Sequence, residues 1–162
     1  QVDAQLMIVG DGDARRYLER LSRRLGIESR TVFTGFVSRE AELPGVYRLG
    51  AVFVIASRIE AEGIVVLEAA ASGLPIVAVR ATSMIELVEE PGCGFLVEPG
   101  DLEGLATHLA KIVQDENQRR RLGESARRMA LDHSLSRSVE LYEALYERVL
   151  RERTTTRVAA AG

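Results

Sequence analysis

Short apolar runs alternate with longer amphipathic segments along the chain. The runs are rich in Val, Ile and Phe, and they occupy residues 6–10, 31–37, 51–57, 75–79 and 94–97. Runs of this length and composition predict β-strands. The first, third and fourth are continuously apolar, which is typical of strands covered on both faces of a parallel sheet.

The segments between these runs place apolar residues three or four positions apart, which predicts helices. In residues 13–25 the apolar positions are Tyr17, Leu18, Leu21 and Leu25. Further helices are predicted at residues 39–50, 63–73, 83–90, 101–115, 117–131 and 135–152. Because strands alternate with helices, we predict an α/β fold, a doubly wound parallel sheet of five strands with helices on both faces.

Composition and charge narrow the class of protein. The chain has 162 residues, with a hydrophobic share of 46% and a charged share of 28%, as in ordinary globular domains. We assign residues 1–153 to one domain and expect a disordered tail at 154–162, where no periodicity is visible. The formal net charge of −3 attracts neither nucleic acid nor an anionic membrane. No apolar run reaches the roughly 18 residues of a membrane span, so we expect no membrane span and a cytoplasmic location.

Residues that carry redox or metal chemistry are sparse. Cys93 is the one cysteine, so an internal disulfide is impossible. With no histidine nearby, its position in a Gly-rich turn favours a packing role over a reactive thiol. His108 and His133 lie on predicted helices far apart in sequence, so no metal site is expected.

The loop after the third strand is the first candidate site, because ligands of doubly wound sheets bind beyond the carboxyl ends of the strands. This loop opens a helix that begins near Glu62 or Gly63. The first amides of that helix are unpaired and carry the positive end of its dipole, which suits a phosphate or diphosphate. Gly63 lacks a side chain where a ligand would approach the backbone.

Two carboxylates, Glu60 and Glu68, lie eight residues apart around this helix start. The helix is apolar nearly all round, so the carboxylate of Glu68 needs hydrogen-bond donors. A vicinal diol, such as the 2′ and 3′ hydroxyls of a ribose, supplies two donors, and a surface arginine at the helix edge is an equal alternative. Glu60 either bonds the hydroxyls of a group attached to the diphosphate or is a solvated loop residue.

The stretch SRIEAEGIVVLEAAASGLPIVAV, residues 57–79, resembles the Glu-x7-Glu segment of retaining glycosyltransferases of the GT-B fold, the group-one family that uses nucleotide sugars. Residues 6–27, 31–58, 93–113 and 141–150 also resemble the family, in the expected order. The resemblance implies a Rossmann-like half of a GT-B fold that binds a UDP-, GDP- or ADP-sugar. It implies glycosyl transfer with retention of configuration, without a metal or other cofactor.

The resemblance also implies a role for each residue of the matching motifs. Glu60 would be the catalytic residue that contacts the donor sugar, and Glu68 would bind the ribose. The remaining donor-binding positions are the diphosphate group Ala61, Glu62, Gly63 and Ile64, the pair Gly35 and Phe36 near the donor, and the pair Val37 and Arg39 beside the base.

The chain departs from the family pattern at several positions. Ala61 replaces a glycine, Glu62 replaces an aromatic residue, and Thr82 and Ser83 replace two glycines. The family's N-terminal acceptor domain, its partner in a full-length enzyme, is absent, and transfer by this chain alone is not expected. A non-catalytic or engineered Rossmann-like fragment is therefore the alternative function.

A dinucleotide-binding dehydrogenase is a weaker alternative, suggested by VGDGDARR at residues 9–16. Gly10 and Gly12 fit that motif. Arg15 occupies the position of the third glycine, and the acidic Asp11 and Asp13 would repel a pyrophosphate.

The family's first strand is also absent, and in the expected order 3-2-1-4-5-6 that strand is central. A central slot with unpaired backbone on both sides is unfavourable. Either a second chain fills it, as in a homodimer, or the flanking strands 6–10 and 51–57 pair directly. We predict closure, with the flavodoxin-like strand order 2-1-3-4-5.

Overall fold

The computed structural model describes residues 2–59 and 62–159. It has five short parallel strands, β1 Leu6–Ile8, β2 Thr31–Phe33, β3 Phe53–Ile55, β4 Ile76–Val79 and β5 Gly94–Val97. The helices are α1 Arg15–Arg24, α2 Leu43–Leu49, α3 Ile64–Ala71, α4 Thr82–Met84, α5 Leu102–Gln114, α6 Glu116–Asp132 and α7 Leu135–Ala159. A 3₁₀ turn η1, Glu28–Arg30, precedes β2, and a π-helical turn η2, Ile85–Glu89, follows α4. The predicted alternation of strands and helices is confirmed.

Local sequence signals explain several helix boundaries. Pro44 lies in the first turn of α2, where a missing backbone N–H costs little, so the helix starts there instead of being broken there. Asp101 caps α5 by accepting a hydrogen bond from the Gly104 amide at 2.8 Å. Asp115 caps α6 in the same way through the amide of Gln118, at 2.9 Å.

The main core lies around β4, whose four residues are all buried. Because side chains alternate across a strand, Ile76 and Ala78 face one side and Val77 faces the other. Ile76 and Ala78 join a cluster with buried residues of α3, η2 and α6. Val77 packs with Ile112 of α5 and the residues around it. Helices therefore cover both faces of the β3–β4–β5 sheet, as the sequence predicts.

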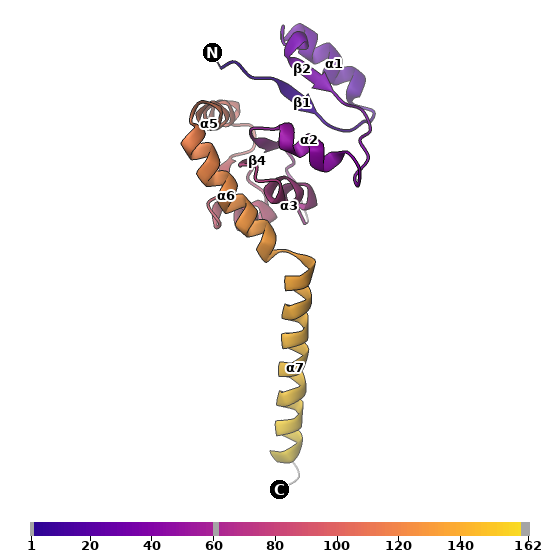
Figure 1. Ribbon diagram of the computed structural model, residues 1–162, viewed down its shortest axis with the longest axis vertical. Helices are drawn as coiled ribbons and strands as arrows, with labels where there is room; N and C mark the ends of the chain where they lie inside the picture. Colours follow the sequence, from indigo (N-terminus) through magenta and orange to yellow (C-terminus); the bar gives the residue numbers. More distant parts are fainter. Residues whose placement is uncertain (1, 60–61, 160–162) are drawn as a thin grey trace.

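The five strands form two sheets, and the predicted closure is wrong. Within the described ranges β1 pairs only with β2, with Met7 opposite Val32, while β3 pairs only with β4 and β4 continues to β5. In Figure 1 the β1–β2 pair and α1 lie together, apart from the helices packed around β4. Strands β1 and β3 are therefore not paired with each other, and the strand order 2-1-3-4-5 is not formed.

The short strands and the anchoring of α2 account for the open slot. A three-residue strand offers closure only a few hydrogen bonds, each worth about 1 kcal/mol net. The crossover helix α2 is held on the β3 unit, since the Tyr47 ring packs edge-on against Phe53 with centroids 6.0 Å apart. The end of β1 is tied to the β2 side, because the Gly10 amide donates to the Gly35 carbonyl at 3.1 Å.

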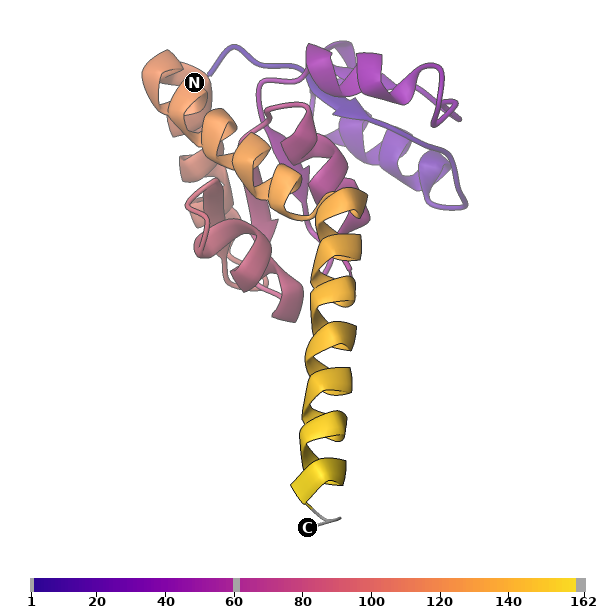
Figure 2. The ribbon, with the colours of Figure 1, turned by 60° about the horizontal axis from the view of Figure 1, so that its bottom comes forward.

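Helix α7 runs away from the rest of the molecule, as both ribbon views show (Figures 1 and 2). Its apolar side chains are largely exposed, among them Leu135, Tyr142 and Tyr146. The helix continues to Ala159, into the segment 154–162 for which the sequence predicts a disordered tail. Extending an existing helix adds one hydrogen bond per residue, so the helix can include residues of low helix propensity such as threonine.

Candidate functional site

Gly63 is the N-cap of α3, and its backbone is left-handed with φ at 65°. The residue is buried, and a Cβ there would lie 2.7 Å from Cδ1 of Leu87 and 3.2 Å from Cε of Met84. The left-handed backbone therefore favours glycine here, and a larger residue would also require Leu87 and Met84 to shift. The predicted start of this helix, near Glu62 or Gly63, is confirmed.

The other diphosphate positions surround this helix start. Glu62 and Ile64 are both exposed. Glu60 and Ala61, the predicted sugar contact and the first diphosphate position, lie outside the described residues. Helix α3 is the first element after the carboxyl end of β3. This is where the topology predicts a ligand.

The carboxylate of Glu68 is bonded by two residues of the protein. Arg39 donates to Oε1 from Nε at 2.9 Å and from Nη2 at 2.6 Å. The Tyr47 hydroxyl donates to Oε2 at 3.0 Å. The Glu68 side chain is 24% exposed and that of Arg39 is 69% exposed. The arginine partner that the sequence offered as an alternative is thus present, and ribose binding by Glu68 stays a prediction.

Tyr47 is the residue of this cluster that the sequence reasoning missed. Burial, followed by the hydrogen bond to Glu68, raises the pKa of the Tyr47 hydroxyl, so it remains a donor across the physiological range. The sequence signal that could have indicated this residue was a tyrosine on the helix that precedes β3. The residue that this hydroxyl meets is 21 positions away, which only the tertiary structure reveals.

The predicted positions Gly35, Phe36 and Val37 follow β2. Gly35 is buried with φ at 70°, and its carbonyl joins the loop after β1 through Gly10. Phe36 is 86% exposed, an unusual state for a phenylalanine, and Val37 is half-buried. The loop therefore presents an exposed aromatic ring three residues before Arg39, which bonds Glu68 of α3.

The loop after β1 does not have the form of a dinucleotide-binding turn. The Gly12 amide donates to the carboxylate of Asp11 at 2.8 Å, so the donor that a pyrophosphate would need is already used. Arg15 forms ion pairs with Asp11 and Glu19, at 3.2 and 2.9 Å. These contacts oppose the dehydrogenase alternative.

A second polar cluster lies at the same carboxyl edge, at the end of β4. Arg80 donates to both oxygens of Glu89, at 3.0 and 2.8 Å, and to Glu98 at 2.9 Å. The hydrogen bond from Arg80 holds the pKa of Glu89 below its ordinary value. Through these bonds Arg80 links the end of β4 to Glu89 at the end of η2 and to Glu98, the residue after β5.

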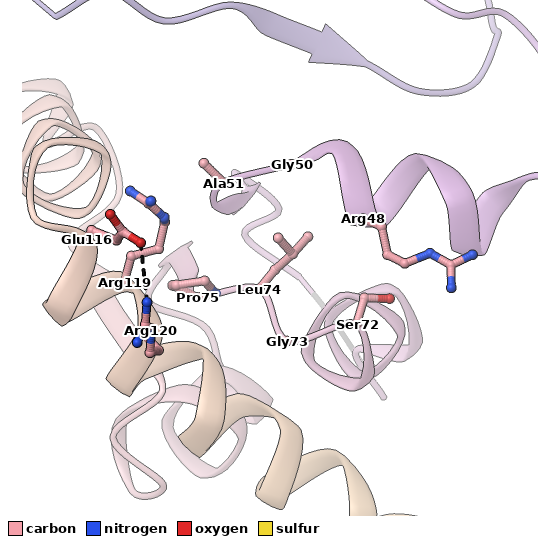
Figure 3. A pocket seen from close by; sticks show the side chains of 10 residues that line it. All are labelled: Arg48, Gly50, Ala51, Ser72, Gly73, Leu74, Pro75, Glu116, Arg119 and Arg120. Carbon is pink, nitrogen blue, oxygen red and sulfur yellow. Dashed lines mark hydrogen bonds and ion pairs between the residues drawn. The ribbon is translucent and has the colours of Figure 1, made fainter.

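A cavity of about 270 Å³ lies at the opposite edge, where β3 and β4 begin (Figure 3). Its lining includes Arg48, Glu116, Arg119 and Arg120. Arg120 pairs with Glu116 at 3.3 Å, and Arg119 donates to carbonyls at the end of α5. In Figure 3 Arg48 extends away from Arg119 and Arg120, so the guanidinium groups do not converge on one point. The cavity is therefore a poorer candidate than the edge at α3.

Cys93 is completely buried, and burial raises the pKa of its thiol to about 11. Its Sγ donates to the Leu87 carbonyl at 3.2 Å. Among the described residues no group of three His, Cys, Asp or Glu side chains is arranged to hold a metal ion. In the same part of the chain, no helix is both long and apolar enough to span a membrane.

Comparison with known proteins identifies relatives over most of the chain. It is 35% identical over 153 residues to N-acetyl-alpha-D-glucosaminyl L-malate synthase of Bacillus anthracis, covering 94% of this chain and 39% of that protein. It is 38% identical to sulfoquinovosyl transferase of Arabidopsis thaliana over 128 residues, covering 77% of this chain and 24% of that protein. The chain therefore spans less than half the length of these curated relatives.

Solved structures also match most of the chain. The HepE protein of Anabaena in complex with UDP superimposes with a TM-score of 0.72 and 27% identity, covering 89% of this chain and 41% of that one. Sucrose-phosphate synthase of Thermosynechococcus elongatus superimposes with a TM-score of 0.78 and 28% identity, covering 92% of this chain and 39% of that one. The model of the family described as "Glycosyl transferases group 1" matches residues 1–129. The chain belongs to this family of glycosyltransferases.

Proposed function

We propose that this chain binds the nucleoside diphosphate sugar donor of a retaining glycosyltransferase. The amide end of α3 would take the diphosphate, Glu68 the ribose, and the loop from Gly35 to Arg39 the base. Glu60 would contact the sugar. In the whole protein, a separate acceptor domain would bind the molecule that receives the sugar.

The observation that carries this proposal is the half-buried carboxylate of Glu68 on the helix whose first two residues, Ile64 and Val65, are exposed. Glu68 lies four residues after Ile64, about 6 Å along the helix axis. A ligand with an anionic part and a hydroxyl-bearing part at that separation fits both groups. The exposed ring of Phe36 offers a stacking surface for a base at the same edge.

Relatives support the same assignment. The HepE protein of Anabaena has been solved with UDP, with UDP and glucose, and with UDP-glucose, at 26–27% identity to this chain. The helix dipole at Gly63 would stabilise the charge that grows on the departing diphosphate. Glu62 adds a negative charge beside this position, but its side chain is solvent-exposed, so water and salt screen it.

Calorimetric titration of the full chain with UDP, GDP and ADP tests the proposal. One of the three should bind, and Glu68→Ala should weaken that binding about 10- to 100-fold, since a hydrogen bond to a charged group contributes about 1.5–3 kcal/mol. Glu124→Ala is the matched control, because Glu124 is an exposed glutamate on α6, far along the chain from the site. Equal affinity in the Glu68 variant would reject the assignment.

The alternative function is a non-catalytic fragment that keeps the fold. It is favoured by the pairing of Glu68 with Arg39 and Tyr47, which satisfies the carboxylate without any ligand. The same titration separates the two functions, because a scaffold without nucleotide affinity would give no heat with any of the three nucleotides.

A further inference from the structure

The two oxygens of the Glu68 carboxylate have different partners. Oε2 accepts a hydrogen bond from Tyr47, and Oε1 accepts both N–H groups of Arg39. An arginine that faces a free carboxylate commonly uses two parallel bonds, one to each oxygen. Here both guanidinium donors lie on one oxygen, and the tyrosine hydroxyl bonds the other.

The two partners also differ in how firmly they are held. Tyr47 lies on α2, where its ring packs edge-on against Phe53 of β3, and its hydroxyl is also 3.4 Å from the Val65 carbonyl. Arg39 lies in the loop before α2, and most of its side chain is exposed. Releasing an exposed ion pair costs little, because such pairs contribute about 1 kcal/mol or less in solvent. Tyr47 is therefore the fixed partner of Glu68, and Arg39 is the exchangeable one.

We propose that Tyr47 is a positioning residue that makes Glu68 selective for the 2′-hydroxyl of a ribonucleotide. By holding Oε2, Tyr47 fixes the plane of the carboxylate and directs Oε1 toward the ligand side, where a ribose hydroxyl replaces Arg39. Arg39 then swings free and can meet the base or the phosphates. This inference rests on the proposed function of Glu68 as the ribose ligand.

The selectivity has a physical reason. A carboxylate that is free to rotate can adapt to a sugar with one hydroxyl missing, whereas a fixed carboxylate presents Oε1 in one direction only. The 2′-deoxy analogue then offers no hydroxyl in exchange for the Arg39 ion pair, and so it binds less well. Loss of the tyrosine hydroxyl should therefore lower the preference for ribose more than it lowers affinity in general.

The test compares UDP with 2′-deoxy-UDP by calorimetry, or the matching pair for whichever nucleotide binds best. The wild-type chain should prefer the ribonucleotide by about tenfold, and Tyr47→Phe should reduce this preference to about twofold. Tyr17→Phe is the control, since Tyr17 is an exposed tyrosine on α1 and should leave the ratio unchanged. A merely structural role for Tyr47 would lower the melting temperature but leave the ratio as in wild type.

Arg39→Gln keeps the proposal testable should Tyr47→Phe fold poorly, because Arg39 is exposed and its loss leaves the core intact. This variant should keep the preference for the ribonucleotide whatever its effect on affinity, since Tyr47 and not Arg39 fixes the carboxylate. A wild-type ratio in Tyr47→Phe, or loss of the preference in Arg39→Gln, would overturn the inference while nucleotide binding itself persists. Binding that is absent, or unaffected by Glu68→Ala, would instead remove the proposed function and this inference with it.

Discussion

Gly63 packs against the Leu87 side chain, which would have to shift to admit any side chain at position 63. A Cβ at Gly63 would lie 2.7 Å from Cδ1 of Leu87, on a backbone whose φ is 65°. The contact joins the start of α3, where the donor diphosphate is proposed to bind, to η2. The glycine that the sequence marks as a ligand-approach position is therefore also a packing position.

Gly63→Ala should lower the free energy of unfolding by about 2–4 kcal/mol, because a left-handed backbone and an overpacked core each add a cost. Urea denaturation measures this. Gly45→Ala is the opposite-sign control: Gly45 lies within α2 with no atom within 4 Å of a built Cβ, so alanine there should stabilise by about 0.5–1 kcal/mol. Equal stability of the Gly63 variant and wild type would contradict the packing described for η2.

Arg80→Gln should destabilise the protein at neutral pH but not in acid. The pKa of Glu89 in the folded protein lies below its ordinary value of 4.5, because Arg80 hydrogen-bonds the carboxylate. The contribution of the pair is thus present above about pH 4.5 and is lost as the pH falls through the folded pKa. Melting temperatures of wild type and variant should converge between pH 5 and about pH 3.

The control for this pH series is Arg120→Gln, which removes a largely exposed i,i+4 ion pair with Glu116 on α6. That variant should track wild type across the range, as exposed pairs contribute little. A constant gap between wild type and Arg80→Gln at all pH values would show that Arg80 acts through packing and not through its charge.

Cys93 should be inert in the folded protein. Its side chain is fully buried and its pKa is raised to about 11, so the reactive thiolate is scarce at pH 8. A colorimetric disulfide reagent should react with less than a tenth of the chains within minutes, and with all of them in denaturant. Rapid labelling without denaturant would place Cys93 at an accessible surface and contradict the core around Val88.

Removing residues 135–162 should leave the remaining fold intact. Helix α7 extends away from the molecule, and none of its described side chains, those of residues 135–151, belongs to the two buried clusters. The melting temperature of the truncated chain should stay within a few degrees of wild type. Truncation after residue 115 is the contrast, because it also removes Ala126 and Met129 of α6 from the core and should abolish cooperative unfolding. Loss of cooperative unfolding when only residues 135–162 are removed would show that α7 is part of the core.

The sequence by itself determined the elements and the family. Strand and helix positions follow from the local spacing of apolar residues, so β4 and α3 could be predicted from their continuous apolar character. The start of α3 at Ile64 followed from Gly63. The Glu-x7-Glu resemblance led to the family that the comparisons show.

Tertiary structure decided which of these elements meet. Closure of the sheet was a wrong prediction because strand pairing depends on edges that are distant in sequence, and here β1 and β3 are not paired with each other. Tyr47 could not be assigned from sequence, because its partner Glu68 lies on the helix after the next strand. Periodicity is a property of neighbours along the chain, whereas a hydrogen bond between α2 and α3 exists only once the sheet has brought the two helices together.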